Sequence, residues 1–217
     1  MDDSELIRIT AEHVKAAMAG DSSGHDWWHV YRVWQMAIRL ADETEANRVI
    51  VELGALLHDI ADWKLNNGDL EIGPKVAREW LESVGADSEV INEVSEIVAG
   101  SSFIGAGEPD RAYSLESQIV QDADRLDALG AVGIGRTFAF GGARNRQMYD
   151  PGIAPIDHAN FESYKSSASP TINHFYEKLF LLKDRMHTAI GRDIAEGRHQ
   201  YMVEFVHRFF EEWNGKI

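Results

Sequence analysis

Four side chains that could bind a metal ion are spread over three apolar stretches of the chain. His29 lies in the first stretch, His58 and Asp59 stand next to each other in the second, and Asp124 lies in the third. Burying an unpaired charge is costly, and proteins avoid that cost by pairing the charge or by giving it a metal ion. Two imidazole nitrogens and two carboxylates suit a divalent first-row ion and leave room for water or substrate oxygens. Taken as one set, the four side chains are therefore candidates for a metal site.

Each of these residues taken alone has a structural explanation. A single inward-facing histidine at a helix start, such as His29, is more often a hydrogen-bonded core or capping residue than a ligand. Asp124 alone could form a buried ion pair with a neighbour on its own helix. Asp127, three residues further on, is as compatible with a structural role as with a role supporting a metal ligand. Only the combination indicates a site.

Apolar side chains repeat at helical spacing around every candidate ligand. His29 continues the apolar stripe of its segment, so its imidazole is expected to face inward. Asp62 follows His58 by four residues and Asp59 by three, which places it on their helix face and near any bound metal. The helices expected to carry the candidates span about residues 29–43, 44–63 and 114–140.

The rest of the chain shows the same periodicity, and no alternating strand pattern of convincing length occurs. Further helices are expected at about residues 5–19, 74–84, 88–99, 171–188 and 193–213. The sequence predicts an all-α fold: one compact helical domain over residues 1–217 with a C-terminal helical extension. Within it, the metal-site core would span about 25–140, a long loop 141–170 and the C-terminal helices 171–213. A loop of that length is more often functional than idle.

Composition narrows the classes of partner. The net charge of −15 opposes binding to nucleic acid polymers and to anionic membrane surfaces, because both depend on Lys and Arg. A small phosphorylated substrate remains compatible with this charge, since a bound cation reverses the local field. No run of about 18 apolar residues, no signal-peptide pattern and no cysteine is present, so a cytoplasmic location is expected. Small residues between Ala128 and Gly135 could serve a homodimer or packing within the monomer.

Several motifs in this chain are similar to those of the HD-domain superfamily of metal-dependent phosphohydrolases, which is all-helical. Together they resemble its YpgQ-like subgroup, some members of which act as nucleoside triphosphate pyrophosphohydrolases. The resemblance covers nearly the whole chain. Its motifs are Gly24-His25-Asp26-Trp27-Trp28-His29-Val30, Leu56-Leu57-His58-Asp59-Ile60-Ala61-Asp62-Trp63-Lys64, the segment from Ile119 to Ala131, Arg136-Thr137-Phe138 with Gly141-Gly142, and the segment from His174 to Leu179.

The resemblance implies that His29, His58, Asp59 and Asp124 bind one divalent ion. Manganese is favoured among Mn, Fe, Co, Ni, Mg and Zn. Asp122 also precedes the Arg-Leu pair, but Asp124 directly adjoins it and matches the ligand position better. Among the side chains of this site, the expected catalytic carboxylates are Asp59 and Asp62.

Asp62 stands where related enzymes carry a catalytic carboxylate, often a glutamate, and it would accept or relay a proton. The positive side chains expected to bind substrate phosphates are Lys64, Arg125, Lys178 and Lys183. For each lysine the alternative is an ordinary solvated surface residue.

One departure from the family pattern concerns the segment Gly100-Ser101-Ser102-Phe103. Relatives often have a histidine before the Ser-Phe pair, and HD enzymes with two metals use additional histidine ligands. Its absence favours a single ion in this chain and leaves any substrate contact of that histidine in doubt.

The favoured function is metal-dependent hydrolysis of a nucleotide-like phosphate substrate, most simply release of pyrophosphate from a nucleoside triphosphate. The metal would lower the pKa of a bound water and polarise a phosphoryl oxygen. Two alternatives remain open. One is an HD phosphatase acting on nucleoside monophosphates or on an alarmone; the other is a non-catalytic binding module that retains the metal.

Overall fold

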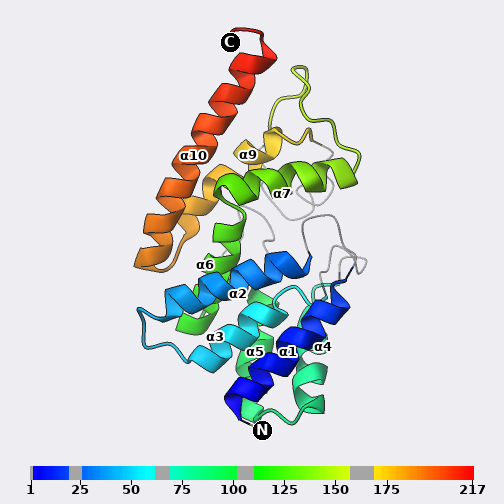
Figure 1. Ribbon diagram of the computed structural model, residues 1–217, viewed down its shortest axis with the longest axis vertical. Helices are drawn as coiled ribbons and strands as arrows, with labels where there is room; N and C mark the ends of the chain where they lie inside the picture. The colour runs from blue at the N-terminus through cyan, green and yellow to red at the C-terminus, as the bar shows by residue number, and fades with distance from the viewer. Residues whose placement is uncertain (1, 20–25, 62–68, 102–109, 157–168) are drawn as a thin grey trace. The chain divides into compact units, whose positions relative to one another are not determined.

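The computed structural model describes residues 2–19, 26–61, 69–101, 110–156 and 169–217. Throughout these ranges the regular secondary structure is helical, with no β-strand, which confirms the predicted all-α fold. The described residues that precede Arg125 form one compact unit, and those from Arg125 onward form a second. Figure 1 shows the helices of both units in chain order.

The first unit is built around one short helix that is buried on all sides. This helix, α3 (Arg48–Leu57), has every residue from Ile50 to Leu57 buried, as expected of a helix that is apolar around its whole circumference. It packs against α1 (Asp3–Ala17), α2 (Trp27–Ala41) and α5 (Ser88–Ser101) (Figure 1).

Two further helices complete the first unit. Helix α4 (Ile72–Ser83) packs against α5, and α6 (Leu115–Asp127) carries the unit's last described residues, up to Asp124. Gly54 of α3 lets α5 approach closely, because a Cβ atom there would lie only 3.0 Å from the side chain of Ile97.

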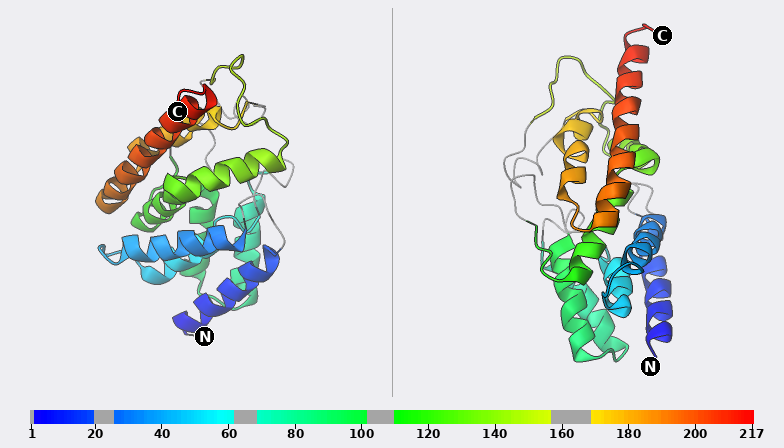
Figure 2. Two further views of the ribbon diagram at one scale, coloured as in Figure 1. Left: turned by 45° about the horizontal axis from the view of Figure 1, so that its top comes forward. Right: turned by 90° about the vertical axis from the view of Figure 1, so that its left-hand side faces the viewer.

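The second unit has an aromatic core. It comprises α7 (Gly130–Ala143), α9 (Asn173–Glu177), the 3₁₀ helix η2 (Leu179–Arg185) and α10 (Ala189–Trp213). Helix α10 packs along α7 and η2 (Figure 2). The ring of Phe138 lies 6.3 Å from that of Phe175 and 6.1 Å from that of Phe205, centroid to centroid. Such contacts bury large apolar areas in favourable ring geometries.

The single helix expected over residues 114–140 is in fact two helices, α6 and α7, and this prediction was wrong. Tight turns at Ala128 and Leu129 end α6, and Gly130 begins α7 with a φ of 75°, a conformation that residues with a Cβ rarely adopt. Gly133 stabilises the break, because a Cβ atom at that position would overlap the Ala128 carbonyl group. The glycines that suggested close helix packing therefore also mark the break.

The helix expected over 44–63 is shorter than predicted, because side chains cap both of its ends. Asn47 precedes α3 and accepts a hydrogen bond from the backbone N–H of Val49 at 3.1 Å. After Leu57 the described chain continues in turns.

The helix expected over 171–188 is also different in the structure. Lys178, with φ −143° and ψ −57°, separates the short α9 from η2. Thr188 then caps α10 by accepting a hydrogen bond from the N–H of Gly191.

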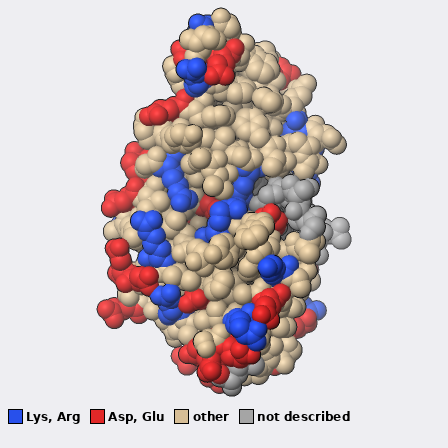
Figure 3. Space-filling model, viewed as in Figure 1, with Lys and Arg blue, Asp and Glu red and all other residues tan. Residues whose placement is uncertain are grey.

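The surface of the first unit mixes charges of both signs. Figure 3 shows acidic and basic side chains interspersed on the face that carries α1 and α2. On α1, Arg8 pairs with Glu5 at 2.8 Å and with Glu12 at 2.6 Å. Among the helices of the described residues, none combines the length and the apolar character needed to cross a bilayer.

We expect opposite effects from adding a methyl group at two glycines of α7. Gly133→Ala should lower the free energy of unfolding by about 1–3 kcal/mol, because the added Cβ collides with backbone that cannot move aside. Gly135→Ala should raise it by about 0.5–1 kcal/mol, because no atom lies within 4 Å of that Cβ position and alanine favours helix. Urea unfolding of both variants measures the difference; equal effects would contradict the described break between α6 and α7.

Candidate metal centre

The start of α2 fixes the position of His29. Asp26 is the N-cap residue, and its carboxylate accepts a hydrogen bond from the backbone N–H of His29 at 3.0 Å. Aspartate is a preferred N-cap because its oxygen satisfies a backbone donor that the helix leaves without a partner. This cap starts the helix at Trp27, two residues before the predicted start. Asp26 was missed as a functional residue, although an Asp three residues before a helical His is a recognisable capping signal.

The end of α3 fixes the position of His58. His58 is the C-cap residue, and its Nδ1 lies 2.8 Å from the carbonyl oxygen of Ala55. Because a carbonyl only accepts, Nδ1 carries the proton of this hydrogen bond. The neutral ring therefore presents the Nε2 lone pair on its other side, as a metal-binding imidazole does. Asp59 follows in the turn after the helix.

Helix α6 supplies the carboxylate of Asp124. Two residues along a helix correspond to about 200° of rotation, so Asp122 points to the opposite side, where it is fully buried. Gln121 of α6 donates a hydrogen bond to the carbonyl of Gly100 at 2.8 Å and thereby ties α6 to the end of α5. Of the two candidate aspartates, Asp122 and Asp124, it is Asp124 whose carboxylate lies close to the histidines.

The predicted ligands from these three elements converge. The Nε2 atoms of His29 and His58 are 3.2 Å apart. An oxygen of Asp59 lies 3.4 Å from Nε2 of His29 and 3.7 Å from Nε2 of His58. For Asp124 the corresponding distances are 3.5 and 3.9 Å. Within the described part of the chain, His29, His58 and Asp59 are also the one group of three or more possible ligands gathered tightly enough for an ion.

These distances fit a shared metal ion. Ligands about 2.0–2.2 Å from a metal, at angles of 90–110°, lie about 2.8–3.6 Å from one another. The measured separations of 3.2 to 3.9 Å come within about 0.5 Å of that range. The donor set also balances charge, since two carboxylates neutralise a divalent cation while the imidazoles stay neutral.

The two carboxylates are the more exposed part of the cluster. The side chains of both histidines are 1% exposed, whereas those of Asp59 and Asp124 are 20% and 33% exposed. Water or a substrate oxygen would therefore approach on the carboxylate side.

The structure describes only some of the other residues predicted for the site. Asp62 and Lys64 lie outside the described residues. Arg125 is buried and donates hydrogen bonds to the Arg185 carbonyl and, at 3.2 Å, to Nε2 of His187. Both contacts of Arg125 lie within the second unit.

The two predicted lysines of the second unit lie on consecutive elements. Lys178 is half-buried at the end of α9. Lys183 on η2 pairs with Glu196 of α10 at 3.0 Å, and the hydrogen bond to Glu196 raises the pKa of Lys183 above its ordinary value.

Asp127 has a structural contact. Its carboxylate pairs with Arg136 of α7 at 3.0 Å, and both side chains are largely buried.

Ser101 stands at the position where relatives often carry an extra histidine. It donates a hydrogen bond to the Ile97 carbonyl within α5.

Comparison with known proteins identifies the family of this chain. Residues 27–129, which contain all four converging side chains, match the family model of the HD domain. The chain is also 35% identical to the uncharacterized protein YpgQ of Bacillus subtilis over 203 residues, 93% of this chain and 91% of YpgQ. The chain belongs to the HD-domain family.

Solved HD-domain structures extend the likeness over almost the whole length. An HD-superfamily hydrolase from Bacillus thuringiensis is 45% identical, with a TM-score of 0.75, over 98% of this chain and 99% of that one. A Lactobacillus plantarum protein is 34% identical with a TM-score of 0.87, and the match covers 99% of this chain and 100% of that protein. The structure of YpgQ in complex with ADP is 31% identical with a TM-score of 0.76, and the match covers 98% of this chain and 96% of YpgQ. This HD-domain protein is thus a metal-dependent hydrolase in the general sense of its superfamily.

The cap at Asp26 predicts a measurable contribution to the stability of this HD domain. Asp26→Ala should lower the free energy of unfolding by about 1 kcal/mol, because the N–H of His29 loses its side-chain acceptor. Asp26→Asn keeps an acceptor oxygen and should stay within about 0.5 kcal/mol of the wild type. Urea unfolding of the metal-free protein tests both. An Asn variant as unstable as the Ala variant would show that the cap is not what matters at this position.

Proposed function

We propose that this protein hydrolyses a phosphoanhydride bond of a nucleotide, most simply by releasing pyrophosphate from a nucleoside triphosphate. In this proposal His29, His58, Asp59 and Asp124 hold one divalent cation, with manganese favoured. The observation that carries the proposal is the approach of both carboxylates to both imidazoles within 3.4–3.9 Å. A nucleotide as substrate is supported by YpgQ, whose structure was solved in complex with ADP.

Each ligand has a defined part in this chemistry. A bound divalent cation supplies Lewis acidity: it polarises a phosphoryl oxygen and makes water a competent nucleophile near neutral pH. The His58 Nδ1–H bond to Ala55 holds that ring with its Nε2 lone pair facing the site. Asp59 and Asp124 supply the negative charge and lie on the solvent-accessible side, where water and phosphate arrive.

Proton transfer is assigned to Asp62. It follows His58 by four residues, and the family pattern carries a catalytic carboxylate at this point. In the proposed step its carboxylate accepts a proton from the attacking water as the new phosphorus–oxygen bond forms and the anhydride bond breaks. Asp62→Asn should therefore lower kcat while metal affinity stays near that of the wild type.

Phosphate binding must come from local positive groups, because the chain as a whole carries a charge of −15. Lys64 and Lys178 are assigned direct contacts with the substrate phosphates. Lys183 would have to exchange Glu196 for the substrate, and Arg125 already binds a backbone carbonyl and His187. These two are therefore assigned weaker, supporting roles.

A nucleotide panel tests the proposed reaction. Metal-stripped protein should be inactive, and restored Mn²⁺, Co²⁺, Ni²⁺ or Mg²⁺ should allow release of pyrophosphate from triphosphates. Asp59→Ala and Asp124→Ala should each lower kcat/KM by at least about 100-fold, because ligand loss costs no less than loss of a group that supports a ligand. Glu12→Gln, which changes an exposed carboxylate on α1, is the matched control and should leave turnover unchanged.

The products separate this proposal from its alternatives. Inorganic phosphate from monophosphates would mark an HD phosphatase, and pyrophosphate from an alarmone would mark a different substrate. If no metal restores hydrolysis of any member of the panel, while His29→Ala still lowers Tm in the presence of metal, the protein is a metal-containing binding module.

A further inference from the structure

A buried carboxylate joins the two helices that carry His29 and His58. Glu52 of α3 is only 8% exposed. Its Oε2 accepts a hydrogen bond from Nε1 of Trp34 on α2 at 2.8 Å, and its Oε1 accepts one from Nε of Arg48 at 2.9 Å. A buried carboxylate without such partners would be strongly destabilising, so these bonds constrain both helices.

The same network makes a second contact with α2. The Arg48 guanidinium also hydrogen-bonds the carboxylate of Asp42, the C-cap residue of α2. The hydrogen bond to Glu52 is the main cause that raises the pKa of Arg48 above its usual value. The chain of contacts therefore begins on α2 at Trp34, crosses α3 through Glu52 and Arg48, and returns to α2 at Asp42.

This network lies in register with the two histidines. The contact between Asp42 and Arg48 joins the end of α2 to the start of α3. The contact between His29 and His58 joins the start of α2 to the end of α3, so the two helices run antiparallel. Five residues separate His29 from Trp34 on α2, and six separate Glu52 from His58 on and after α3. At 1.5 Å per residue these intervals are about 7.5 and 9 Å. The Trp34–Glu52 bond therefore lies about one and a half turns from the histidine pair, at nearly the same level on both helices.

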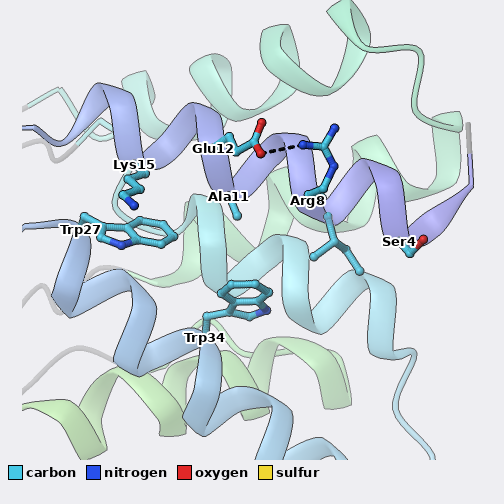
Figure 4. Close-up of a pocket in the computed structure, with 8 residues that line it drawn as sticks. Ser4, Arg8, Ala11, Glu12, Lys15, Trp27 and Trp34 are labelled. Carbon is cyan, nitrogen blue, oxygen red and sulfur yellow. Dashed lines mark hydrogen bonds and ion pairs between the residues drawn. The ribbon is translucent and has the colours of Figure 1, made fainter.

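Packing alone would specify this register less sharply. Most of the buried residues of α2 and α3 are aliphatic, and the contacts of aliphatic side chains have no preferred direction. Figure 4 shows Trp27 and Trp34 projecting from α2 toward α1, where they line an open groove. The other residues that line it are Ser4, Ile7, Arg8, Ala11, Glu12 and Lys15. The indole of Trp34 has two directional contacts: an edge contact with the ring of Tyr31 on the same helix and the hydrogen bond to Glu52. Of these two, the hydrogen bond is the one that reaches α3.

We propose that Trp34 and Glu52 are positioning residues that hold His29 and His58 at the separation one metal ion requires. This inference rests on the proposed metal site. A shift of α2 along α3 by one helical turn would move the histidines about 5.4 Å relative to each other. That shift exceeds the 3.2 Å between their Nε2 atoms, so even part of it would remove one ligand.

Trp34→Phe tests the inference, because it keeps an aromatic ring and removes only the donor N–H with the outer ring. Trp80→Phe is the matched control: Nε1 of Trp80 on α4 donates to Oγ1 of Thr10 on α1 at 3.0 Å, a contact that involves neither α2 nor α3. Both variants lose one indole hydrogen bond within the same unit. Calorimetric titration of each metal-stripped variant with Mn²⁺ gives the Kd, and thermal unfolding without metal gives Tm.

Trp34→Phe should raise the Kd for Mn²⁺ by about 10–100-fold, as loss of groups that orient metal ligands does elsewhere. Trp80→Phe should change Kd by less than about twofold even where its loss in Tm is as large. In turnover assays, the Mn²⁺ concentration at half-maximal rate should rise for Trp34→Phe, whereas kcat at saturating Mn²⁺ should return to near the wild-type value.

Glu52→Gln provides a second test if Trp34→Phe does not fold. It retains the side-chain shape and one acceptor oxygen, but its NH₂ group faces one of the two donors, Trp34 or Arg48. It should also raise the Kd. Wild-type affinity for Mn²⁺ in either variant, or an equal loss in Trp80→Phe, would overturn the inference. A wild-type protein that binds no divalent cation would instead overturn the proposed metal site, so the two failures are distinguishable.

Discussion

The Nε2 atoms of two imidazole rings, each belonging to a side chain that is only 1% exposed, lie 3.2 Å apart. Nδ1–H of His58 is committed to the Ala55 carbonyl, so the neutral ring directs a lone pair at Nε2 of His29. At that distance Nε2 of His29 can donate a hydrogen bond to this lone pair, or both nitrogens can offer a lone pair to a cation between them. With the carboxylates of Asp59 and Asp124 within 3.9 Å, a divalent cation is the simplest group that satisfies all four donors.

Much of the first unit positions these donors. Asp26 starts α2 so that His29 occupies its first turn, and His58 ends α3 with its own ring bonded to a free carbonyl of that helix. The bond from Gln121 to Gly100 ties α6 to α5, which packs against α3. Histidines at helix ends have a further advantage here, because they reach inward without placing a polar ring in the middle of an apolar helix. Family membership and the cluster of His29, His58 and Asp59 therefore both point to a divalent metal in this unit.

How much could be read from the sequence depends on how local each signal is. The helical fold follows from apolar periodicity. The convergence of His29, His58 and Asp124 was expected because each lies on an apolar stretch that must be buried. The ends of the helices were less predictable. The break at Gly130 requires a residue without a Cβ at position 133, because the carbonyl of Ala128 occupies that space, and residue spacing alone does not show this. Composition and spacing gave only candidate ligands; the resemblance to a family implied that the four side chains bind one metal ion.

The contacts that were missed involve residues distant in sequence or with two competing roles. The bond between Trp34 and Glu52 joins residues on different helices, and a lone glutamate in an apolar helix gives no hint of its partner. Lys183 was expected near substrate, but its pairing with Glu196 depends on how η2 meets α10. Likewise, the choice between a structural and a supporting role for Asp127 required the position of Arg136 on the next helix.

The central claim is that four side chains from α2, the end of α3 and α6 share one cation. Anomalous diffraction from crystals grown with Mn²⁺ tests it most directly. We expect one strong peak, about 2.0–2.3 Å from Nε2 of His29, Nε2 of His58 and a carboxylate oxygen each of Asp59 and Asp124. A strong peak elsewhere, or a peak at this position that Asp124 or His29 does not contact, would contradict it.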